Sequence, residues 1–134
     1  MMEINMPITS EWGNPQKTII HSVFDPVWTL DEYHGMIDTM HKMVISVDHP
    51  VHFISDFTNS NASPAKLLST GRHIENTKTE NSGINVIVNA NGFLKAMANV
   101  SQRLFLKDVQ IYFADSVEEA YQIVAKHEQT HAQR

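Results

Sequence analysis

Apolar residues alternate with polar ones at the start of the chain, and this spacing predicts β-structure. From Ile4 to Trp12 roughly every second residue is apolar, which is typical of a half-buried strand, and Pro7 favours a position at the edge of a sheet. Gly13-Asn14-Pro15-Gln16 is a turn signal, because glycine permits positive φ and proline fixes φ. Thr18 to Phe24 is dense in β-branched and aromatic residues. The two segments therefore predict an N-terminal β-hairpin.

A change to helical spacing follows Asp25-Pro26. The segment Thr29-Leu30-Asp31-Glu32 matches a capping box, in which a threonine hydroxyl and a glutamate carboxylate each accept from a backbone N–H at the helix start. From Leu30 to Val47 apolar residues recur at steps of three and four, so one stripe of this helix faces a core. The helix is expected to end near Val47, before Asp48-His49-Pro50.

Three further strands are predicted, each followed by a helix. The strands are Val51–Phe57, Ile84–Val88 and Val109–Phe113, and the second is apolar enough to be buried on both faces. The helices begin at Ser63-Pro64, at Asn91-Gly92 and at Ser116-Val117-Glu118-Glu119, which is a second capping box. Residues 127–134 are polar and are expected to form a frayed tail.

The predicted order is β-β-α-β-α-β-α-β-α. Strands that alternate with helices pair in parallel through right-handed crossovers. The expected fold is therefore α/β, with a mixed, mostly parallel five-stranded sheet and about four helices in a single domain over residues 1–126. A length of 134 residues and a mass of 15.2 kDa fit one domain.

Composition narrows the range of partners. Ten Lys and Arg against fifteen Asp and Glu give a net charge of −5, which argues against nucleic acid or an anionic membrane as the main partner. The absence of cysteine excludes disulfides and thiolate chemistry and fits a cytoplasmic location. No apolar run is long enough to span a membrane, and Met1 to Asn5 does not resemble a signal peptide.

Several short segments resemble small bacterial proteins of the SpoIIAA-like (STAS-like) superfamily. They are Trp12…Asn14-Pro15…Lys17-Thr18-Ile19, Trp28-Thr29-Leu30-Asp31-Glu32, His49-Pro50-Val51, Asp56-Phe57-Thr58-Asn59-Ser60, Val86-Ile87-Val88 and Ser116-Val117-Glu118-Glu119-Ala120. In order and spacing they cover roughly residues 8 to 126. The resemblance implies a mixed sheet with helices and a role that is usually non-enzymatic.

The same resemblance implies two candidate switch residues. In the anti-sigma-factor antagonists of this superfamily, a phosphorylatable serine follows the third strand within an Asp-Ser-Ser-Gly-type sequence. The equivalent stretch here runs from Asp56 to Pro64 and lacks that string. Ser60 and Ser63 lie in the corresponding loop, so they are the candidate phosphorylation sites.

Polar residues follow the predicted parallel strands at their C-terminal ends, where open α/β sheets usually bind ligands. This candidate ligand edge consists of Asp56, Thr58, Asn59, Asn89, Asn91, Asp115 and Ser116. Nearby helix N-termini favour a small anion or a phosphate. The alternative is structural, because serine and asparagine are also typical helix caps and aspartate is a typical turn residue.

The third predicted helix is apolar around more than half of its circumference. Phe93, Met97, Val100 and Leu104 form one side, and the candidate interface residues Leu94, Ala98 and Phe105 lie on another. Burial on both sides favours a homodimer or a protein partner, and a wide core face is the alternative.

No pattern predicts catalysis or a bound metal. The eight histidines lack the spacing of a metal site, and there is no nucleophile elbow or glycine-rich phosphate loop, so no cofactor is expected. The first hypothesis is a non-enzymatic interaction or regulatory module. The second is a small-molecule or anion-binding protein, less readily a modest enzyme, that uses the strand ends or an apolar pocket under the first helix. His52 and Asp56, four residues apart on one strand, are its first titratable groups to test.

Overall fold

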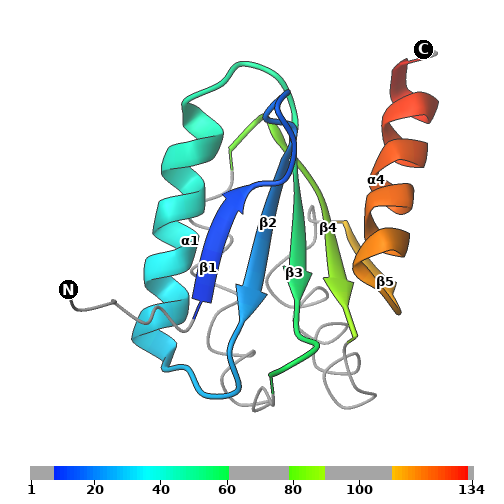
Figure 1. Cartoon of the computed structure of the whole chain (residues 1–134). Helices are drawn as coiled ribbons and strands as arrows, with labels where there is room; N and C mark the ends of the chain where they lie inside the picture. The colour runs from blue at the N-terminus through cyan, green and yellow to red at the C-terminus, as the bar shows by residue number, and fades with distance from the viewer. Residues whose placement is uncertain (1–7, 61–78, 90–109, 133–134) are drawn as a thin grey trace.

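The computed structural model describes residues 8–60, 79–89 and 110–132 of the chain. Within them, five strands form one mixed sheet in the order β1-β2-β3-β4-β5, with two helices packed on it (Figure 1). The elements are β1 Ile8–Trp12, β2 Ile19–Phe24, α1 Leu30–Ile45, β3 Val51–Asp56, β4 Ser82–Val88, β5 Ile111–Ala114 and α4 Val117–Ala132. The predicted α/β class and its N-terminal hairpin are confirmed.

The second and third predicted helices lie outside the described residues. So do the candidate switch residue Ser63, the ligand-edge residue Asn91 and the candidate interface residues Leu94, Ala98 and Phe105.

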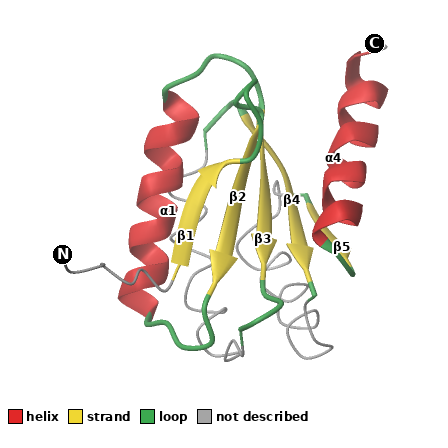
Figure 2. Ribbon diagram, in the orientation of Figure 1, coloured by secondary structure: helices red, strands yellow, loops and turns green. Residues whose placement is uncertain are grey.

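The hairpin forms one edge of the sheet. β1 and β2 pair antiparallel, with Ile8 opposite Phe24 and Trp12 opposite Ile20, and the Gly13 N–H donates to the Ile19 carbonyl at 2.7 Å. The pairs β2–β3, β3–β4 and β4–β5 are parallel, as the alternation of strands and helices predicts (Figure 2). Among the described strands β1 thus lies at the edge of the sheet, as Pro7 in the preceding sequence indicates.

Reciprocal capping fixes the start of α1. The Thr29 N–H donates to Glu32 Oε1 at 2.8 Å and the Glu32 N–H donates to Thr29 Oγ1 at 3.1 Å, so the predicted capping box is confirmed. The helix ends at Ile45, two residues before the predicted Val47. The side-chain amide of Asn81, just before β4, donates to the Val44 and Val47 carbonyls at 2.9 and 3.2 Å. A distant residue therefore satisfies carbonyls that a longer helix would have bonded internally.

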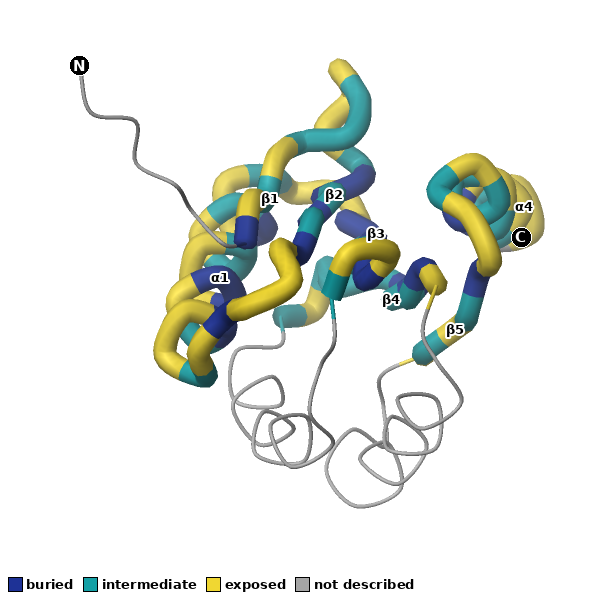
Figure 3. Tube along the Cα trace, turned by 60° about the horizontal axis from the view of Figure 1, so that its bottom comes forward, coloured by how far each residue is buried: buried dark blue, intermediate teal, exposed yellow. Residues whose placement is uncertain are grey.

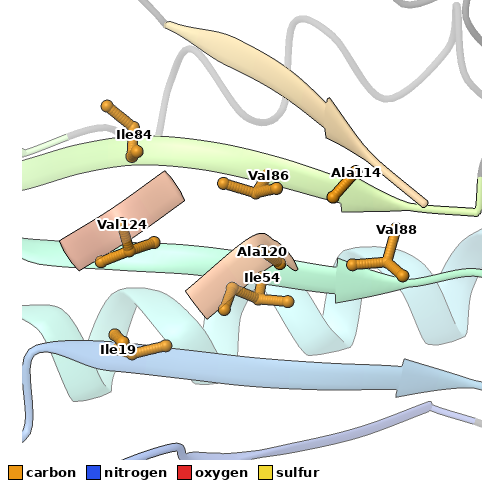
Figure 4. Packing of buried hydrophobic residues seen from close by; sticks show 8 residues of the cluster. All are labelled: Ile19, Ile54, Ile84, Val86, Val88, Ala114, Ala120 and Val124. Carbon is orange, nitrogen blue, oxygen red and sulfur yellow. The ribbon is translucent and has the colours of Figure 1, made fainter. Parts of the chain in front are cut away.

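The two helices lie on opposite faces of the sheet. Side chains of adjacent strand residues point to opposite faces, and the consecutive residues Ile19 and Ile20 belong to different core clusters. The cluster under α4 contains Ile19, Ile54, Ile84, Val86, Val88, Ala114, Ala120 and Val124 (Figure 4). Figure 3 shows buried positions, in dark blue, along the strands and on α1 and α4.

The core under α1 is rich in aromatic side chains. Phe24 stacks on Phe57 with ring centroids 4.2 Å apart, and Trp28 lies edge-on to Phe24 at 5.6 Å. Tyr33 and Met36 of α1 complete this cluster. On β4, Ile87 packs against the α1-side cluster while Ile84 and Val88 pack under α4, so β4 makes apolar contacts on both faces, as its sequence predicts.

The C-terminal helix differs from its prediction at both ends. Ser116 Oγ accepts from the Glu119 N–H at 3.1 Å, but the Glu119 carboxylate returns to the Asp115 N–H at 3.3 Å, one residue before the predicted partner. At the other end, α4 continues to Ala132, so the expectation of a frayed tail from residue 127 is wrong for residues 127–132. The His127 ring packs edge-on to His52 at 5.4 Å, which holds this part of the helix against β3.

Candidate functional site

Three of the predicted ligand-edge residues form a chain of hydrogen bonds where β3 and β4 end. Asp56 Oδ1 accepts from the Thr58 N–H at 2.9 Å and also from the Thr58 hydroxyl. The Asn89 side-chain amide donates to Thr58 Oγ1 at 2.6 Å, and Asn89 has a positive φ of 58°. The strand ends meet as predicted, but their polar groups bond to one another and hold the loops.

The remaining described members of the ligand edge have capping or surface positions. Asn59 is exposed in the turn after β3. Asp115 and Ser116 are exposed and make the capping bonds to Glu119 at the start of α4. In register, Asp56 lies beside Val88 and Val88 beside Ala114, so the three strand ends are level. These bonds favour the structural interpretation of this edge over a ligand site.

The candidate switch residue Ser60 is held by a tryptophan. The Trp28 indole N–H donates to Ser60 Oγ at 2.7 Å, and Trp28 is 2% exposed. The Ser60 N–H also donates to the Phe57 carbonyl at 3.0 Å. This hydroxyl therefore ties the loop after β3 to the aromatic core, and a phosphoryl group on it would alter that bond.

His52 is built into the sheet. It is 4% exposed, and its Nδ1 accepts from the Ile84 N–H at 3.0 Å, where a strand carbonyl would ordinarily be. The β3–β4 register shifts between Val51 and Phe53 at this point. His52 and Asp56 are four positions apart along the strand, about 13 Å, and both side chains make local structural bonds. The two titratable groups that the second hypothesis would test first are therefore both bonded within the fold.

The sequence patterns did not predict a further group of contacts, which joins Tyr121 to His21 and Gly13. Tyr121 of α4 places its hydroxyl 3.4 Å from His21 Nδ1 and 3.5 Å from the Gly13 carbonyl that it donates to. Burial raises the pKa of Tyr121 above its ordinary value of 10.0. A Cβ at Gly13 would lie 2.4 Å from the Tyr121 hydroxyl, so the absence of a side chain there permits this contact. Tyr121 is 100 or more positions away from both His21 and Gly13, so no local sequence pattern links it to them.

A groove runs between the outer edge of β1 and α1. It has a volume of about 560 Å³, and its lining residues come from one strand and one helix face: Ile8, Thr9, Ser10, Glu11, Glu32, Gly35, Met36 and Thr39. Two sequence features relate to this groove: Pro7, which indicates an edge strand, and the glycine inside the α1 sequence. Neither signal shows from sequence alone that the strand edge and the helix face lie side by side.

The edge of β1 presents backbone groups to this groove. The Gly13 N–H bonds to Ile19, and antiparallel ladders alternate, so Thr9 and Glu11 bond to β2 while Ile8, Ser10 and Trp12 direct their N–H and C=O groups away from it. The Ser10 and Ser22 hydroxyls lie 2.8 Å apart, which fits the closer side chains of a non-hydrogen-bonded pair. Among the described strands, none lies beyond β1.

Neither a metal cluster nor a membrane-crossing helix is found in the part of the chain that the structure describes. Residues 8–60, 79–89 and 110–132 contain no group of three or more His, Asp or Glu side chains arranged to hold a metal ion. No helix within them is long and apolar enough to cross a membrane. Comparison of the chain with models of protein families and with curated proteins finds no match.

Proposed function

We propose that this protein is a non-enzymatic interaction module of the SpoIIAA-like (STAS-like) kind, acting in the cytoplasm, and that it binds an extended segment of a partner protein along β1. The observation that carries the proposal is the groove beside the outer edge of β1, walled by α1. The mixed sheet with its N-terminal hairpin supports the proposed relationship to the SpoIIAA-like superfamily. The internally bonded strand ends favour this surface over the ligand edge.

The backbone of β1 suits the addition of a strand. Ile8, Ser10 and Trp12 direct hydrogen-bonding groups outward, and an extended peptide that pairs with such an edge gains main-chain hydrogen bonds while its alternate side chains enter neighbouring pockets. Side chains of such a peptide on the α1 side would lie against Gly35 and Met36. Backbone pairing supplies affinity and the groove supplies selectivity.

Gly35 supports a partner on this face of α1. A glycine inside a helix costs about 0.5–1 kcal/mol relative to alanine, so it needs a reason. A Cβ at Gly35 would meet nothing within 4 Å among the described residues, so no contact with them requires the glycine. Its place in the wall of the groove supplies the reason, since a missing side chain allows a partner to approach the helix closely.

A small-molecule ligand is the second candidate for the same groove. The volume of about 560 Å³ is in the range of small-ligand sites, and the groove lies against the first helix, where an apolar pocket was one of the two predicted ligand positions. The strand edge along its side favours a peptide, because a small ligand does not need a row of outward-facing backbone groups.

The test is selection of peptides from a library of random ten-residue sequences displayed on phage, with the full-length protein immobilised. Recovered peptides should perturb the amide signals of Ile8, Ser10 and Trp12 in ¹⁵N spectra. Ser10→Pro should abolish binding, because it removes an outward N–H and leaves the β2 ladder intact. Ser10→Ala, which keeps that N–H, is the matched control. Peptides that bind Ser10→Pro as well as wild type, or no recovered peptides, would contradict the proposal.

A further inference from the structure

We infer that the segment bound along β1 is basic, with Lys or Arg on both of its faces, an odd number of positions apart. This inference rests on the proposed strand-docking function. Among the described residues, the charged ones that line the groove are Glu11 and Glu32. Both are acidic and both are exposed, and the whole chain carries a net charge of −5. Charge complementarity therefore favours a basic partner.

The two glutamates lie on different faces of the strand edge. Ile8 packs in the α1-side cluster, so Glu11, three residues further along β1, points to the opposite face. Glu32 is on α1 itself, one helical turn before the groove residue Met36. An added strand presents alternate side chains to the two faces, so one basic residue would meet Glu11 and another would meet Glu32.

The spacing of the two basic residues along the bound segment follows from the positions of Glu11 and Glu32. Met36 and Tyr33 of α1 pack in one cluster with Ile8, so the start of α1, including Glu32, lies near the start of β1 (Figure 1). Glu11 lies three residues beyond Ile8. Three positions is an odd separation, which places two residues of a strand on opposite faces. A spacing of three between the basic residues is therefore expected.

A second copy of this chain is a poorer occupant of the groove. Pairing of two β1 edges would bring Glu11 and Glu32 of one subunit close to the same acidic residues of the other. Like charges placed opposite each other are unfavourable. A homodimer through the third predicted helix is a separate hypothesis that does not involve this groove.

The test uses the peptides recovered by display on the wild-type protein. Basic residues three positions apart should be enriched among them, and binding of a labelled peptide should be measured by fluorescence anisotropy at about 50 mM and 500 mM salt. Replacement of both basic residues by Gln should weaken binding at low salt roughly three- to tenfold. High salt should remove most of that difference.

Matched substitutions locate the effect on the protein. Glu32→Gln retains a side chain that can cap α1 and should weaken the basic peptide severalfold without changing binding of its Gln version. Asp31→Asn removes one charge from the same first turn, but Asp31 does not line the groove, so it should change binding less. Glu11→Gln should act like Glu32→Gln.

The possible failures are distinguishable. Recovered peptides that perturb the β1 amides but are neutral or acidic, or equal effects of Asp31→Asn and Glu32→Gln, would overturn the inference and leave strand docking intact. Recovery of no peptide that depends on the β1 edge would overturn both.

Discussion

The Trp28 indole N–H donates to the Ser60 hydroxyl across 32 residues of sequence, at 2.7 Å. This bond joins the loop after β3 to the aromatic cluster under α1. The hydroxyl that the superfamily resemblance marks as a candidate switch is therefore also part of the fold. Changes at Ser60 should register in stability as well as in partner binding.

Replacement of Ser60 by alanine should lower the free energy of unfolding by about 1–2 kcal/mol, because it removes the acceptor of the indole N–H of the buried Trp28. The measurement is urea unfolding followed by tryptophan fluorescence. Ser46→Ala is the control, since that hydroxyl bonds to the Met43 carbonyl at an exposed helix end and should matter less. Equal stability of Ser60→Ala and wild type would show that the Trp28 bond is not a stabilising contact.

The same substitution at two glycines should act in opposite directions. Gly35→Ala should stabilise the protein by about 0.5–1 kcal/mol, because the helix loses a flexible residue and the new Cβ meets open space. Gly83→Ala should destabilise it by roughly 1–3 kcal/mol, because a Cβ would lie 2.2 Å from His52 Nδ1 and 2.9 Å from the Val51 carbonyl oxygen.

Thermal and urea unfolding of the two variants measure this contrast. A stable Gly83→Ala variant would contradict the packing of the His52 ring over β4. If Gly35→Ala is more stable and also binds recovered peptides more weakly, the glycine has been retained at a cost in stability for binding.

Alkaline pH should reveal the burial of Tyr121. Its pKa is raised in the folded protein by desolvation, so the unfolded chain loses this proton at a lower pH than the folded one. The stabilising contribution is complete below pH 10 and declines as pH rises through the folded pKa. Stability of wild type should therefore fall more steeply above pH 10 than that of Tyr121→Phe.

Tyr112→Phe is the matched control, because Tyr112 is 42% exposed. Urea unfolding of the three proteins at pH 8 and above pH 10 makes the comparison, and other titrating groups cancel in the differences. Parallel pH profiles for Tyr121→Phe and wild type would contradict the prediction.

Asn89 combines a left-handed backbone with a side-chain bond, and two substitutions separate these contributions. Asn89→Ala should cost about 2 kcal/mol, because it loses the Thr58 bond and puts at positive φ an alanine, which lacks the polar side chain that helps asparagine to tolerate this conformation. Asn89→Gly loses the bond but tolerates the φ of 58°, so it should cost less. A glycine variant less stable than the alanine variant would show that backbone strain does not govern this position.

Local sequence signals predicted well the elements that the structure describes. The alternation before Trp12, the Thr29–Glu32 capping box and the apolar run from Ile84 to Val88 each depend on neighbours in the chain, and the structure contains the strand, the cap and the buried strand that they indicate. The order of strands and helices likewise predicted the parallel pairing.

Local sequence signals could not predict contacts between residues that are far apart in the chain. Asn81 bonds to carbonyls at the end of α1 from 34 or more residues away. His127 packs on His52 although its segment is polar enough to suggest a tail. The groove is formed by β1 and α1 together, and neither sequence alone shows a cavity. Asp56, Thr58 and Asn89 lie together at the strand ends as expected. Their hydrogen bonds to one another depend on interatomic distances that the sequence does not reveal.

Each strand from β2 to β5 pairs with the strand that precedes it along the chain. During synthesis, each new strand can therefore add to an edge already formed by earlier residues, and α1 can cover β1 and β2 early. The cluster under α4 is completed last, because Ala120 and Val124 belong to the final helix. A nascent chain that stops before residue 117 would expose Ile54, Val86 and Val88 on that face. Emergence of α4 from the ribosome is thus the step that completes this cluster.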